Sequence, residues 1–182
     1  LINQLGLQTI KIPSGEITNL PFLREIGSCN KKIIISTGMA SLSEIKQALL
    51  ILENAGTSRS KITVLHCNTE YPTSMKDVNL NAMLTIKNEC SVDVGYSDHT
   101  IGTEAAVLSV ALGASIIEKH FTIDKNYSEF RDHQLSADPN EFSQLVERVK
   151  NASKLLGQSE KTVQKSEILA MESVRRSIVA KK

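Results

Sequence analysis

Five short apolar runs recur along the chain, each separated from the next by the length of a helical crossover. They span residues 7–13, 31–37, 61–67, 91–97 and 115–121. Their apolar positions are continuous rather than alternating, which is typical of strands buried on both faces of a parallel sheet. The pattern therefore predicts five parallel strands with helices between them.

Segments with helical periodicity fill several of the intervals between these runs. The clearest, residues 41–56, opens with a capping box in which Ser41 and Glu44 satisfy each other's backbone groups. Further helices are predicted over residues 102–113, which are almost wholly apolar or small, and over residues 138–157. Strict strand–helix alternation leaves two architectures, an open doubly wound sheet or a (β/α)₈ barrel.

Polar side chains gather at the carboxyl end of every predicted strand. They are Lys11, Ser14, Glu16, Ser36, Thr37, His66, Asn68, Tyr71, Ser97, Asp98, His99, Lys119 and His120. Chemistry supplied by many strand ends at one face is the pattern of the barrel, and no GxGxxG or P-loop motif supports a nucleotide-binding open sheet. We therefore expect an α/β fold of the TIM (β/α)₈ type, with about five βα units here and about three more upstream.

Composition narrows the functional classes. The chain is 41% hydrophobic and 23% charged with a formal net charge of +1, so nothing favours nucleic acid or a membrane surface as a partner. No apolar run reaches the roughly 20 residues of a membrane-spanning helix. Cys29, Cys67 and Cys90 are odd in number and lack CxxC spacing, which indicates reduced thiols and a cytoplasmic protein.

Two of the four histidines, His99 and His120, stand at the ends of neighbouring predicted strands. Parallel strands lie about 4.8 Å apart, so imidazoles at the same end can reach one ion. Neutral imidazole suits Mn²⁺, Zn²⁺ or Fe²⁺. A pair of structural histidines is the alternative, and the residue pattern alone leaves both interpretations open. Asp98 could be a further ligand or could orient an imidazole.

Two polar turns predict an anion site at the same face. Lys11 and Ser14 precede one helix start, and Ser36 with Gly38 precedes another. Ammonium, hydroxyl and free backbone N–H groups together bind phosphate or carboxylate. Either turn alone is equally compatible with an ordinary βα connection. Lys119 adds a different possibility, because a desolvated Lys at a barrel strand end can form a Schiff base, although a paired structural Lys is commoner.

Five motifs occur in a fixed order: KIPSGE, IIISTGMAS, HCNTEYPT, GYSDHT and EKHFT. Over about residues 5 to 182 their order and spacing resemble the sialic acid synthase family, which includes N-acetylneuraminate and legionaminic acid synthases. The resemblance implies that residues 1–158 are strands four to eight of the TIM barrel. It also implies that residues 159–182 are a linker towards a C-terminal antifreeze-like (SAF) domain that this chain lacks.

The resemblance also implies a reaction, a metal and roles for the strand-end residues. The reaction would be the condensation of phosphoenolpyruvate with an N-acetylmannosamine-type sugar, in a homodimer when full-length, giving a nonulosonic acid and phosphate. His99 and His120 would bind a divalent metal, Mn²⁺ first and Mg²⁺ or Co²⁺ as options, and with Glu16 would be catalytic. The implied substrate-binding residues are Lys11, Ser14, Ser36, Thr69, Tyr71, Ser97 and Asp132. The order Asn68-Thr69 is more like the legionaminic branch.

Two other functions remain as alternatives. One is a Schiff-base aldolase that uses Lys119. The other is a non-catalytic barrel fragment that needs the rest of a barrel, and for this reason we expect the 182-residue chain alone to be inactive.

Overall fold

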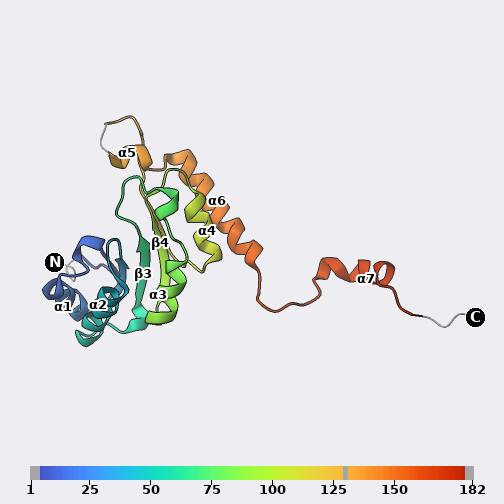
Figure 1. The fold of residues 1–182 in the computed structure, drawn as a ribbon, viewed down its shortest axis with the longest axis horizontal. Helices are drawn as coiled ribbons and strands as arrows, with labels where there is room; N and C mark the ends of the chain where they lie inside the picture. The colour runs from blue at the N-terminus through green and yellow to red at the C-terminus, as the bar shows by residue number, and fades with distance from the viewer. Residues whose placement is uncertain (1–4, 129–130, 179–182) are drawn as a thin grey trace, which may run out of the picture.

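The computed structural model describes residues 5–128 and 131–178, apart from the side chains of Arg131 and Glu172. Five parallel strands form one sheet in chain order, and all five strand predictions are confirmed, most of them with shorter bounds (Figure 1). The strands are β1 (Thr9–Ile12), β2 (Lys32–Ser36), β3 (Ile62–Cys67), β4 (Asp93–Asp98) and β5 (Ile117–Lys119). The sheet curls as part of a TIM-like barrel.

Helices follow the strands as the alternation predicts. They are α1 (Leu20–Ser28), α2 (Leu42–Asn54), α3 (Ala82–Cys90), α4 (Glu104–Ala111), α5 (Arg131–Leu135), α6 (Pro139–Leu156) and α7 (Ile168–Val174), with single turns η1 (Ser14–Glu16), η2 (Arg59–Lys61), η3 (Met75–Asp77) and η4 (Lys165–Glu167). The predicted capping box of Ser41 and Glu44 forms at the start of α2. Across the described ranges, no helix has both the length and the apolar character that crossing a bilayer requires.

The two faces of the sheet carry different chemistry because successive side chains on a strand point to opposite sides. The outer face is mostly apolar and packs against the helices, with Ile12, Ile33 and Val64 fully buried there. Removing such side chains from water is the main driving force for folding. The inner face carries polar residues at the carboxyl ends of the strands, and these form the candidate site.

Gly95 allows β4 and β5 to lie close together. A Cβ atom at this position would stand 2.4 Å from the carbonyl oxygen of Ile116 and 2.5 Å from a methyl carbon of Leu65. The same carbonyl accepts the ladder hydrogen bond from the backbone N–H of Tyr96, at 2.9 Å. Any side chain at this position would therefore push β5 away from β4.

Helix α6 closes the outer layer beside α4. Arg148 donates to the hydroxyl of Thr103 at 2.8 Å and to the carboxylate of Glu104 at 2.9 Å, which fastens the two helices together. The chain leaves α6 at Gly157, and α7 lies beyond the end of α6, away from the sheet (Figure 1). The assignment of residues 159–182 as a linker stays a prediction, and residues 179–182 lie outside the described part.

Candidate active site

Four polar side chains from four strands meet on the inner face. The ammonium of Lys11 (β1) donates to the hydroxyl of Ser36 (β2) at 2.7 Å and lies 3.3 Å from the carboxylate of Glu118 (β5). The hydroxyl of Ser97 (β4) donates to the other oxygen of Glu118 at 2.7 Å. The structure therefore brings together three predicted anion-binding residues, and it adds Glu118 to them.

The turns after β1 and β2 are packed into each other beside this group. The backbone N–H of Gly38 donates to the hydroxyl of Ser14 at 2.9 Å. A Cβ atom at Gly38 would lie 2.0 Å from the hydroxyl oxygen of Thr69 and 3.0 Å from that of Ser14. The predicted substrate-binding hydroxyls of Ser14 and Thr69 therefore approach each other only because position 38 has no side chain.

The two histidines lie beside each other with Tyr71 over them. The ring centroids of His99 and His120 are 5.2 Å apart at an interplanar angle of 76°. The Tyr71 ring stacks on His99 at 4.2 Å and meets His120 edge-on at 5.6 Å. The prediction that neighbouring strands deliver both imidazoles to one point is confirmed in its geometry.

The chemistry of this pair fits a divalent metal. Nδ1 of His99 lies 2.6 Å from the backbone oxygen of Asn68, and because a carbonyl only accepts, this nitrogen must carry the proton. Nε2 then has its lone pair free, which is the arrangement typical of metal-bound histidine. Burial also lowers the pKa of His99 and favours the neutral ring. Among the described residues no group of three or more His, Cys, Asp or Glu side chains is placed so that it could hold a metal ion, and the pair of imidazoles is what this site offers.

Cys67 links the anion-binding group to the histidines, a position that the sequence analysis did not assign. Its sulfur lies 3.6 Å from the hydroxyl of Ser14 and 4.0 Å from Nδ1 of His99. Burial raises the pKa of this thiol, which favours its uncharged form. The two predicted groups are therefore parts of one continuous site.

Glu118 was also missed, although a signal was present. Residues two apart on a strand share a face, so Glu118 had to point to the same side as His120. Lys119 was instead predicted to be the inward-facing residue of this strand end, which put Glu118 on the opposite face and left it out of the predicted site.

Glu16 lies in the turn after β1, and Asp132 lies on α5. The carboxylate of Glu16, in η1, accepts from the side-chain amide of Asn19 at 2.6 Å. Burial first, and then the nearby acidic groups of Cys67, Asp132 and Glu118, raise the pKa of the Tyr71 phenol. Asp132 therefore lies close enough to Tyr71 for its charge to act on the phenol.

Asp98 and Lys119 require a correction. Both were counted among the residues facing the site, but each lies between two inward-facing residues and so points to the outer face. There the ammonium of Lys119 binds the carboxylate of Asp98 at 3.0 Å, with side chains 1% and 0% exposed. Lys119 presents no free amine to a carbonyl carbon in the interior, which argues against the Schiff-base alternative.

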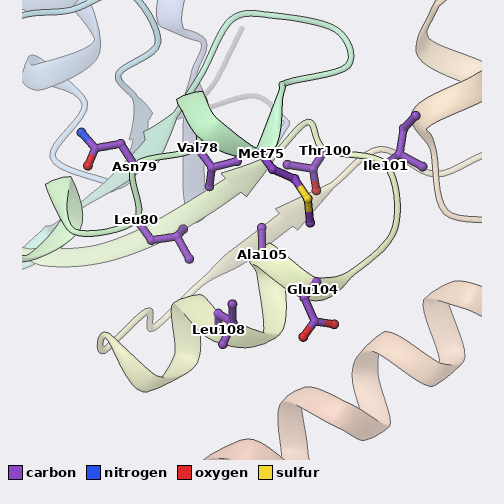
Figure 2. Close-up of a pocket in the computed structure, with 9 residues that line it drawn as sticks. All are labelled: Met75, Val78, Asn79, Leu80, Thr100, Ile101, Glu104, Ala105 and Leu108. Carbon is purple, nitrogen blue, oxygen red and sulfur yellow. The ribbon is translucent and has the colours of Figure 1, made fainter.

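A separate hollow of about 250 Å³ lies outside the barrel interior, between α4 and the segment around η3. Figure 2 shows it lined by apolar side chains such as Met75, Leu80 and Leu108, while Glu104 points away towards α6. Thr100, the residue after His99, forms part of its wall. The hollow therefore borders the outer side of the loop whose inner side carries His99.

Comparison with known proteins identifies the family. The model of the NeuB family matches residues 1–161. The chain belongs to the NeuB family. It is 52% identical over 182 residues to N,N'-diacetyllegionaminic acid synthase of Campylobacter jejuni, covering all of this chain and 54% of that protein. It is 44% identical over 180 residues to the synthase of the same name from Legionella pneumophila, covering 98% of this chain and 50% of that one.

A solved structure agrees with the family assignment. The N-acetylneuraminic acid synthetase of Leptospira borgpetersenii superposes with a TM-score of 0.85 at 36% identity, covering 96% of this chain and 61% of that one. The chain spans about half the length of the curated relatives that it matches. The family and the α/β fold are thereby shown.

Proposed function

We propose that the protein containing this chain condenses phosphoenolpyruvate with an N-acetylated mannosamine-type sugar and releases phosphate. The observation that carries the proposal is a connected group in one site with His99 and His120: Lys11 donates to Ser36 and pairs with Glu118, which accepts from Ser97. Anion-binding groups beside a pair of imidazoles suited to a metal match a substrate that carries phosphate and carboxylate groups and reacts with an aldehyde.

The proposed reaction balances as follows. C3 of phosphoenolpyruvate forms a bond to the aldehyde carbon of the open-chain sugar, and the aldehyde oxygen takes up a proton. Water adds to C2, and the C–O bond to phosphate breaks, which leaves a 2-keto acid. A divalent metal bound by His99 and His120, Mn²⁺ in the first instance, would act as a Lewis acid on the aldehyde oxygen.

The residues of the chain would hold and orient the substrates. The Lys11 ammonium with the hydroxyls of Ser14, Ser36 and Ser97 would bind phosphate and carboxylate through charge-assisted hydrogen bonds. Fixing phosphoenolpyruvate in this way would place its C3 beside the sugar. Positioning of this kind accounts for much of the rate enhancement in reactions between two substrates.

The acceptor sugar would lie on the opposite side of the site. Tyr71, whose ring stacks on His99, would face the sugar, and Thr69, Glu16 and Asp132 would supply further hydroxyl and carboxylate partners for it. Similarity to two legionaminic acid synthases at 52% and 44% identity favours a 2,4-diacetamido sugar over N-acetylmannosamine. Residues 1–158 would be strands four to eight of the barrel, and a homodimer is the expected assembly of the full-length protein.

The test is an acceptor panel with the full-length protein. Phosphate release is measured with phosphoenolpyruvate, Mn²⁺ and either N-acetylmannosamine, 2,4-diacetamido-2,4,6-trideoxymannose or an altrose analogue. We expect turnover that requires all three components and is fastest with the diacetamido sugar. Phosphate release that persists in EDTA and in the H99N/H120N variant would contradict the metal role.

A further inference from the structure

A buried ion pair lies on the outer face of the sheet, directly behind the two histidines of the candidate metal site. Asp98 and Lys119 are opposite each other in the register of β4 and β5, at the last residue of each strand. Their charged atoms are 3.0 Å apart, and both side chains are almost completely buried. The pair therefore joins the two strands at the point where both leave the sheet.

The same two side chains also hold the backbone beyond Asp98. Lys119 donates to the backbone oxygen of Thr100 at 2.5 Å. Oδ1 of Asp98 accepts from the backbone N–H of Thr100 at 2.9 Å and from its hydroxyl at 2.8 Å. His99 is thereby fixed from the residue before it and from the residue after it.

The histidines follow this pair directly in both strands. His99 comes after Asp98 and His120 comes after Lys119, so each imidazole points inwards from a backbone that its outward-facing neighbour restrains. A change in the distance between the charged partners would change the distance between the two rings, whose centroids are 5.2 Å apart.

Stability alone is a weak reason for a buried ion pair such as this one. Burying two charges costs free energy that their attraction often fails to offset, and apolar replacements of similar volume are commonly neutral or stabilising. A fixed geometry is what such a pair supplies in addition. Metal sites need it, because groups that orient the ligands change affinity by about 10- to 100-fold when they are mutated.

We propose that Asp98 and Lys119 are positioning residues for the metal site, which hold His99 and His120 at the separation that one divalent ion requires. The inference rests on the proposed metal role of the two histidines. Neither Asp98 nor Lys119 contacts the ion or a substrate in this arrangement.

The experiment separates positioning from stability in the full-length protein. D98N and K119M each remove one charge, and D98N/K119M removes both. E53Q is the control. It breaks the Glu53–Arg59 ion pair at the amino-terminal end of β3, whereas the site lies at the carboxyl ends of the strands. Co²⁺ affinity is measured by its visible absorption and by calorimetry, and the free energy of unfolding by urea denaturation.

We expect both single variants to bind Co²⁺ about 10- to 100-fold more weakly than the wild type. The double variant should recover stability, because no charge is left unpaired, but it should not recover Co²⁺ affinity. E53Q should lose stability and keep its Co²⁺ affinity. If a single variant fails to fold, T100V removes only the hydroxyl donor to Asp98 and should still weaken Co²⁺ binding several-fold.

Two results would overturn the inference, and they differ in what else they remove. Co²⁺ affinity that is unchanged in these variants, or that recovers with stability in D98N/K119M, ends the positioning role and leaves the metal site standing. A wild-type protein that binds no Co²⁺, or binds it as well as H99N/H120N does, ends the inference and the proposed metal role together.

Discussion

The ammonium of Lys11 and the carboxylate of Glu118 lie 3.3 Å apart although their strands are the two edges of the sheet. The contact crosses the interior of the curled sheet, so both side chains reach inwards from opposite sides. Lys11 therefore has an anionic partner before any substrate arrives. A phosphate group that binds to Lys11 has to compete with Glu118.

The first prediction concerns the cation. In the full-length protein, K11M should raise the KM for phosphoenolpyruvate about 10- to 100-fold, because hydrogen bonds to charged groups contribute about 1.5–3 kcal/mol. Steady-state phosphate release measures this. Lys32 provides the control, since it lies on the same inner face but at the opposite end of β2, and K32M should leave the KM unchanged. Equal effects of both variants would mean that Lys11 is not the specific contact.

The second prediction concerns the competing anion. E118Q should bind phosphoenolpyruvate several-fold more tightly than the wild type, because it removes a negative charge next to Lys11 and keeps a side chain of the same size. Calorimetric titration without the sugar measures the affinity. E16Q removes a carboxylate that pairs with Asn19 instead and should leave the affinity unchanged. Weaker binding by E118Q would show that Glu118 assists the substrate.

The third prediction concerns the packed turns. G38A should lose about 1–3 kcal/mol of stability and most of its phosphoenolpyruvate affinity, because the added methyl group overlaps the hydroxyl oxygen of Thr69. G15A lies in the neighbouring turn with nothing within 4 Å of its added Cβ, and should be close to wild type in both respects. Urea denaturation and calorimetry test the pair, and similar behaviour of the two variants would contradict the packing argument.

The fourth prediction concerns pH. His66 points to the outer face, where its Nε2 donates to the backbone oxygen of Val78 at 2.8 Å, and burial lowers its pKa. The unfolded chain takes up this proton near pH 6.5 and the native state only at lower pH, so stability is complete above about pH 6.5 and falls below it.

H66Q keeps an N–H donor for Val78 and cannot titrate. The free energy of unfolding should therefore fall more steeply in the wild type than in H66Q between about pH 6.5 and 5. Urea denaturation across this interval provides the curves. Parallel curves for the two proteins would show that His66 contributes nothing to the pH dependence.

Local signals explain why most of the fold could be predicted. The predicted capping box of Ser41 and Glu44 lies within one helical turn and forms in the structure, and Asp138 and Glu141 form an equivalent box at the start of α6. Helix α6 shows the limit of this reasoning, since Leu145 is buried while Phe142, three residues earlier on the same side of the helix, remains 37% exposed. Periodicity gives the side of a helix, but the neighbouring element determines how far that side is covered.

The sequence predicted those parts of the site that depend only on the order of the strands along the chain. Histidines at the ends of neighbouring strands had to come close, and they do. The Lys11–Glu118 contact depends on the curl of the whole sheet, and the position of Cys67 depends on how three loops pack, so neither can be read from spacing. Lys119 points to the outer face of the sheet and His120 to the inner face. Strand alternation predicts this difference when it is applied to each residue in turn.

Gly95 shows that a position can be intolerant to mutation although it makes no contact with a substrate. This position lies on the strand pair that carries both histidines, and every side chain larger than hydrogen collides there with the backbone of Ile116. A saturation screen scored by activity would rank position 95 with Lys11 and His120, although Gly95 has no functional group to offer. Intolerance at such a position reports the spacing between two strands, not a role in the reaction.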